Sequence, residues 1–100
     1  MAGAAADTVK IALDVLMCIN ESNADIFPIS EDHAHLYAMR DLFKKFYAVP
    51  APADAPTAKD IAAEAVNLEV IMPSQRVLFQ TLIESKEAMQ AFLKTIENSR

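Results

Sequence analysis

Two histidines close to two acidic residues are the side chains whose types and spacing first suggest chemistry. His33 and His35 are the only histidines in the chain, and Glu31 and Asp32 directly precede His33. On a regular helix, side chains two residues apart point about 200° apart, so both histidines cannot bind one metal ion. Helical zinc sites place their histidines four residues apart, and the chain lacks that spacing. The histidine pair therefore predicts no metal site on a helix.

The two histidines differ in the roles we expect for them. Glu31 and His35 have i, i+4 spacing, so we expect a carboxylate to hold His35 at the edge of the core. We expect His33 to be exposed on the polar face of the same helix. The alternative is a histidine phosphotransfer or metal-using helical protein centred on His33 or His35. The chain resembles histidine phosphotransfer domains only in architecture, because the Lys and Gly-containing stretch that usually follow their histidine are missing from AHLYAMRD.

The sequence contains no other recognisable catalytic motif. Cys18 is the only cysteine and lies in the apolar segment VLMCIN, so we expect a buried thiol that forms no internal disulfide. With Gly3 as the only glycine, neither a GxSxG motif nor a Gly-rich phosphate loop is possible. No pair of carboxylates stands out as an acid and a base. We therefore expect no catalytic residue, metal or cofactor, and predict that the chain is not an enzyme.

The composition narrows the choice of partner. The chain has 14 acidic residues against 9 Lys and Arg, which gives a formal net charge of -5. Nucleic-acid backbones are bound by clustered Lys and Arg, so we expect no nucleic-acid partner. The N-terminus lacks the basic start of a signal peptide, and no apolar run reaches the roughly 18 residues of a membrane span. We therefore expect no membrane contact and a cytoplasmic location.

Hydrophobic patterning predicts an all-α fold. The chain is 53% hydrophobic with a single glycine, and it lacks the alternating runs that are typical of strands. We predict one compact domain over residues 1–100, with about four helices: 5–21, 30–48, a third from Thr57 and a last one ending near 98. The Pro-rich segment VPAPADAP at 49–56 connects the second and third helices. Pro73 either separates the last two helices or kinks one long helix.

Two of the predicted helices carry more apolar surface than one face needs. In residues 5–21 only Lys10, Asp14 and Glu21 form a polar stripe, which predicts a central helix. In the last helix, Phe79 and Ile83 form a second stripe beside the main apolar face. That stripe is either an intermolecular surface or the edge of a wide core face. The surplus apolar surface favours a homodimer with an isologous interface.

The function predicted from these features is binding. We expect a small, acidic, non-enzymatic interaction or regulatory protein that binds a protein partner through an apolar helical surface. Inhibitors, antiactivators, immunity proteins and chaperones of bacterial type share this character by analogy of fold alone. The predicted contact residues are Phe27, Tyr47, Phe79 and Ile83. A further possibility is a small-molecule pocket lined by Met17, Met39 and Met72.

Overall fold

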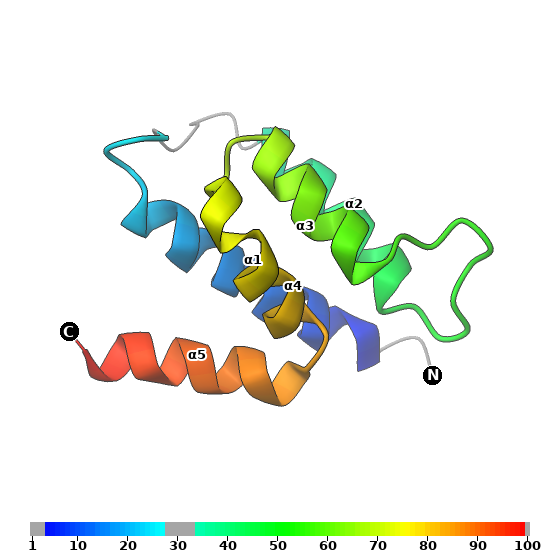
Figure 1. Cartoon of the computed structure of the whole chain (residues 1–100). Helices are drawn as coiled ribbons and strands as arrows, with labels where there is room; N and C mark the ends of the chain where they lie inside the picture. The colour runs from blue at the N-terminus through cyan, green and yellow to red at the C-terminus, as the bar shows by residue number, and fades with distance from the viewer. Residues whose placement is uncertain (1–3, 28–33, 100) are drawn as a thin grey trace.

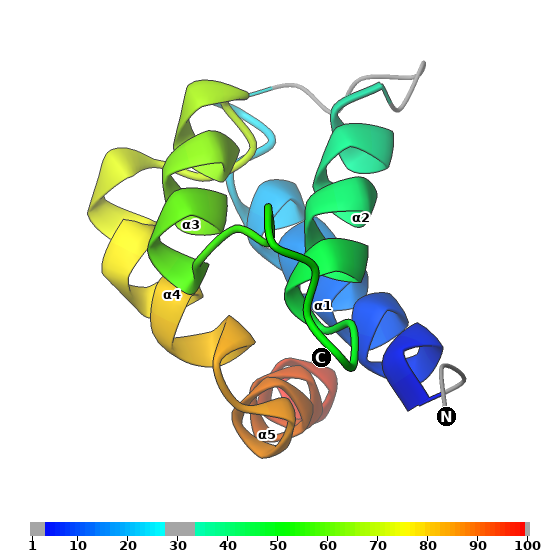
Figure 2. The ribbon, with the colours of Figure 1, turned by 90° about the vertical axis from the view of Figure 1, so that its right-hand side faces the viewer.

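The computed structural model describes residues 4–27 and 34–99, and within these ranges it contains helices and no strand. The elements are α1 (Ala4–Ser22), α2 (Ala34–Phe46), α3 (Ala58–Asn67), the 3-10 turn η1 (Pro73–Gln75), α4 (Arg76–Ile83) and α5 (Lys86–Asn98). Helix α1 packs against α2 and α5, and α3 packs against α2 and α4 (Figures 1 and 2). The predicted all-α bundle is confirmed, with five α-helices in the described ranges where about four were expected.

Helix α1 has the polar stripe that its sequence predicts. Lys10, Asp14 and Glu21 are exposed, and Lys10 forms an i, i+4 ion pair with Asp14 at 3.3 Å. The opposite side supplies a continuous strip of the core, formed by Val9, Ala12, Val15, Leu16 and Ile19. An amphipathic helix of this kind gains its stability by burying its apolar side against neighbouring helices. The elements packed on both sides of α1 make it the helix around which the fold is built.

The Pro-rich connector joins α2 to α3 as expected. Helix α2 ends at Phe46, and residues 48–57 form no helix (Figure 2). Lys45 forms an exposed ion pair with Asp54 at 3.0 Å, and this hydrogen bond lowers the pKa of the Asp54 carboxyl. Val49 is 78% exposed at the start of the connector. The connector therefore lies on the surface, and a side chain in it can be changed without disturbing the core.

Helix α3 begins where the sequence predicts and ends earlier. Thr57 and Asp60 form a reciprocal capping box, with each backbone N–H donating to the other residue's side chain at 3.1 Å. The helix ends because Glu69 adopts a left-handed conformation with φ of 58°. Val70 N–H then donates to the Ala65 carbonyl, and Glu69 N–H to the Val66 carbonyl, both at 3.0 Å. This is a Schellman motif with Glu in the position that glycine usually takes.

The prediction of a single last helix is wrong, because two helices form in its place. Pro73 opens η1, so α3 and α4 are separate helices, which is one of the two outcomes that the sequence left open. A second break follows Ile83, and Ser85 caps α5 by accepting a hydrogen bond from Ala88 N–H at 3.2 Å. Because of this break, α4 and α5 pack against each other as two separate helices. None of the helices within the described residues is both long and apolar enough to span a bilayer.

Candidate functional site

Two of the four predicted contact residues lie in the core. Phe79 and Ile83 are completely buried, which corrects the expectation that they form a surface stripe. Phe79 packs edge-to-face against Phe43, with ring centroids 6.2 Å apart and planes at 64°. The structure therefore supports the other interpretation of this stripe, a wide core face. Neither side chain is accessible to a partner in this fold.

The other two residues are neither fully buried nor fully exposed. Tyr47 is half-buried at the end of α2, and its hydroxyl donates a 2.6 Å hydrogen bond to the Ile83 carbonyl. Burial raises the pKa of the Tyr47 phenol above its ordinary value. Phe27 is half-buried after α1, and the neighbouring Ile26 is 58% exposed. Tyr47 thus joins α2 to the end of α4, and Phe27 offers only part of its ring to the surface.

The structure gives no support to a histidine-centred site. His33, Glu31 and Asp32 lie outside the described residues, and His35 is half-buried on α2. Within residues 4–27 and 34–99, no group of three or more His, Cys, Asp or Glu side chains is placed to hold a metal ion. Met39 is fully buried, and neither Met17 nor Met72 lines the groove described next.

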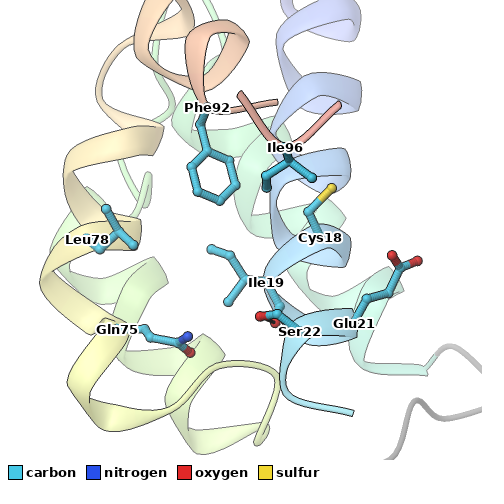
Figure 3. A pocket seen from close by; sticks show the side chains of 8 residues that line it. All are labelled: Cys18, Ile19, Glu21, Ser22, Gln75, Leu78, Phe92 and Ile96. Carbon is cyan, nitrogen blue, oxygen red and sulfur yellow. Dashed lines mark hydrogen bonds between the residues drawn. The ribbon is translucent and has the colours of Figure 1, made fainter. Parts of the chain in front are cut away.

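A groove between α1, α4 and α5 is the candidate binding site. It has a volume of about 450 Å³, and its lining residues are Cys18, Ile19, Glu21, Ser22, Gln75, Leu78, Phe92 and Ile96 (Figure 3). Ile19, Leu78, Phe92 and Ile96 point toward one another from the three helices and form its apolar walls. Gln75, Ser22 and Glu21 lie at the polar end. The C-terminal halves of α1 and α5 diverge beside this groove (Figure 1).

A buried amide network fixes the polar end of the groove. Asn23 Nδ2 donates to Gln75 Oε1 at 2.7 Å, and Gln75 Oε1 also accepts from Met72 N–H at 2.9 Å. One turn earlier, Asn20 Nδ2 donates to the Val70 carbonyl at 3.1 Å. Asn20 and Asn23 are both buried, so these bonds are largely shielded from competing water. The network holds the end of α1 against the segment that leads into α4.

The lining of the groove includes the charged Glu21, whereas several neighbouring positions of α4 and α5 are uncharged. We call six of these the α4–α5 face: Val77, Leu78, Thr81, Phe92, Thr95 and Ile96. Val77 is 63% exposed and Leu78 is 47% exposed, although both are large apolar side chains. Thr81 Oγ1 donates to the Val77 carbonyl, and Thr95 Oγ1 to the Ala91 carbonyl, both at 2.9 Å. Both hydroxyl protons are therefore bonded within their own helices, which lowers the cost of removing water from this face.

Sequence reasoning missed this site because it assigned the wall residues to the core. Helical periodicity puts Leu78, Phe92 and Ile96 on the main apolar face of the single last helix that the sequence predicts. The signal that could have separated them is Ser85 followed by Glu87, a cap and an acidic first turn directly after Ile83. Comparisons of the chain with protein-family models, curated proteins and solved structures gave no significant match. The function is accordingly inferred from the groove and its surroundings.

Proposed function

We propose that the chain is a non-enzymatic protein-binding module whose groove takes apolar side chains from a helical segment of a protein partner. The observation that carries this proposal is the groove between α1, α4 and α5, with its four apolar wall residues and the exposed Val77 and Leu78 beside it. Exposed apolar surface next to a concave site is a common mark of interaction surfaces. An amphipathic helix lying in a groove is a recurrent way to recognise such a segment.

The size of the groove fits this kind of partner. A cavity of about 150 Å³ holds one benzene ring, so a volume of about 450 Å³ has room for roughly three side chains of that size. A helix presents side chains at i, i+4 and i+7 along one face, which matches that number.

The lining supports binding more than chemistry. Cys18 and Glu21 are the titratable groups among the eight lining residues, and the four wall residues that face one another are hydrocarbon. Covering an apolar helix of a partner is the physical act that an inhibitor, antiactivator, immunity protein or chaperone performs. We place the chain in this class of regulatory binding proteins, in which occupancy of the groove blocks or protects the partner's own helix.

The test compares Leu78→Glu with Val49→Glu. Both wild-type residues are exposed, so neither variant should unfold, and Val49 lies in the connector at the far end of the molecule from the groove (Figure 1). Proteins captured from the source organism by the tagged chain are identified, purified and titrated by calorimetry against each variant. Because a charge in an apolar contact must lose its water, we expect Leu78→Glu to bind at least about 30-fold more weakly. Val49→Glu should bind like the wild type.

Circular dichroism of both variants shows whether the fold is kept. A purified partner that binds Leu78→Glu as tightly as it binds the wild-type chain would show that the groove is not the binding site. Equal weakening by Val49→Glu would show that the effect of the added charge is not specific to the groove.

A further inference from the structure

We infer that the partner's segment is a basic amphipathic helix, whose apolar row lies in the groove and whose Lys or Arg side chains lie against Glu21 and the C-terminal turns of α1 and α5. The inference rests on the proposed function, since it names the chemistry of the partner that the same groove takes. Three features carry it: an acidic lining residue, the direction of two helices, and the positions of the neighbouring basic residues.

The first feature is the acidic side chain in the lining. Glu21 is exposed, and together with Cys18 it lines the groove. Lys10, the basic residue of α1, pairs with Asp14 at 3.3 Å. Because a helix rises 1.5 Å per residue, Lys10 lies about 16 Å along the helix from Glu21. The negative charge of Glu21 is therefore not offset by a basic residue of its own helix.

The second feature is that α1 and α5 both end beside the groove. Ser22 is the last residue of α1, Ile96 lies in the last turn of α5, and both line the groove (Figure 3). The C-terminal end of an α-helix carries a negative charge of about half an elementary charge. Neither last turn contains a basic residue, whereas Glu21 lies in that of α1 and Glu97 in that of α5. This end of the groove therefore attracts a cationic side chain and repels a carboxylate.

The third feature is that the basic residues next to the groove walls point away from the groove. Arg76 lies two residues before Leu78 on α4. Lys94 lies two residues from both Phe92 and Ile96 on α5. Side chains two residues apart on a helix point about 200° apart. Since the three wall residues line the groove, both basic residues lie on the opposite sides of their helices and do not face its acidic end.

The apolar walls and the acidic end together fit one kind of helix. Its apolar row fills the space between the walls, and a Lys or Arg follows that row at the end near Glu21. A long basic side chain can lay its methylene stem along an apolar wall while its charged head reaches a carboxylate. The formal net charge of -5 on the chain adds a longer-range attraction for a basic partner. An acidic helix with the same apolar row would meet repulsion at this end.

The experiment is calorimetric titration of the purified chain with two synthetic helical peptides. Both have blocked termini and Leu at positions i, i+4 and i+7, and they differ only in carrying Lys or Glu at both ends. An exposed ion pair and a complementary charge at a helix end each change binding by about 2–5-fold. We therefore expect the Lys peptide to bind about 10-fold more tightly than the Glu peptide at low salt. The preference should shrink at about 1 M salt, where the screening length falls to about 3 Å.

Glu21→Lys and Asp41→Lys are the matched variants, because each changes the net charge by the same amount. A Lys in the last turn of α1 is favoured by the helix dipole, so Glu21→Lys should keep the fold, which circular dichroism checks. Asp41 is exposed on α2, which contributes no residue to the groove lining. We expect Glu21→Lys to lose the preference for the Lys peptide and Asp41→Lys to keep most of it. Glu21→Gln, which removes the charge at nearly the same size, should lower the preference by about 2–5-fold.

Equal affinity for the two peptides overturns the inference, and so does a preference that Glu21→Lys leaves unchanged or that Asp41→Lys removes equally. Failure of both peptides to bind also overturns it. In each case the proposed function is judged separately by the partner titration with Leu78→Glu, which tests occupancy of the groove by any helix. Two peptides that bind equally, and both more weakly to Leu78→Ala, would reject the basic partner and retain the groove as the binding site.

Discussion

The hydroxyl of Tyr47 makes a contact whose removal tests how the helices are held together. It donates a 2.6 Å hydrogen bond to the Ile83 carbonyl, in the last turn of α4, where carbonyl groups lack partners within the helix. The substitution Tyr47→Phe removes this donor and keeps the ring, which packs against Phe43 and Phe46. The change therefore removes this hydrogen bond, together with the longer 3.8 Å contact from the same hydroxyl to Met89 Sδ in α5.

The expected loss of stability follows from the burial of this contact. A hydrogen bond of this kind contributes about 1 kcal/mol net, and a buried carbonyl left without a donor costs about 1–3 kcal/mol. Tyr47 is only half-buried, so water partly replaces the lost donor. We expect the free energy of unfolding to fall by about 1–2 kcal/mol. For a chain of this length, that corresponds to a fall in Tm of roughly 4–16 °C.

The same substitution should change the response to alkaline pH. Burial raises the pKa of Tyr47 in the folded chain, so above the ordinary pKa of about 10 the unfolded chain releases this proton first. The stability that the neutral phenol contributes is therefore complete below that pH and is lost as pH rises toward the folded-state pKa. The wild type should lose stability faster than Tyr47→Phe above pH 10, and the two curves should converge.

Urea denaturation followed by circular dichroism, from neutral to alkaline pH, measures both effects. Tyr37→Phe is the control, because Tyr37 is 55% exposed. The account is refuted if Tyr47→Phe and the wild type have the same free energy of unfolding at pH 7 and lose it equally fast as the pH rises above 10. If Tyr47→Phe weakened self-association and left the free energy of unfolding unchanged, Tyr47 would be an intermolecular contact residue, as the sequence predicts.

Two further substitutions test the core and the end of α3. Phe79→Ala should lower the free energy of unfolding by about 3–5 kcal/mol, because it leaves a cavity at a completely buried site, and urea denaturation measures this. If Phe79→Ala kept its stability and lost self-association, Phe79 would be an exposed contact residue and not a core residue. Glu69→Gly should raise the free energy of unfolding by about 0.5–1 kcal/mol. The left-handed conformation of Glu69 costs a non-glycine residue about 1–2 kcal/mol, which glycine avoids. The greater freedom of glycine in the unfolded chain offsets part of that gain. Glu69→Ala is the control for loss of the charge, and an equal gain with alanine would contradict the backbone explanation.

The sequence by itself determined the features that depend on neighbouring residues. The start of α3 at Thr57, the polar stripe of α1 and the connector after α2 all occur as expected. Capping hydrogen bonds and helical periodicity act within one or two turns, so residue type and spacing suffice to predict them. The all-α class and the approximate positions of the helices follow from the same local rules.

The site, in contrast, was decided by tertiary packing. The Ser85 cap favours a break there, but residues 84–87 carry no proline or glycine, so no local constraint forbids a helix that continues through it. The chain turns there in a fold that packs α4 and α5 against each other and against different neighbours, α3 and α1. That turn sends Phe79 and Ile83 into the core and leaves Leu78, Phe92 and Ile96 around a groove. Which apolar side chains are buried depends on how separate helices fit together, and a helix periodicity measured along one segment does not contain that information.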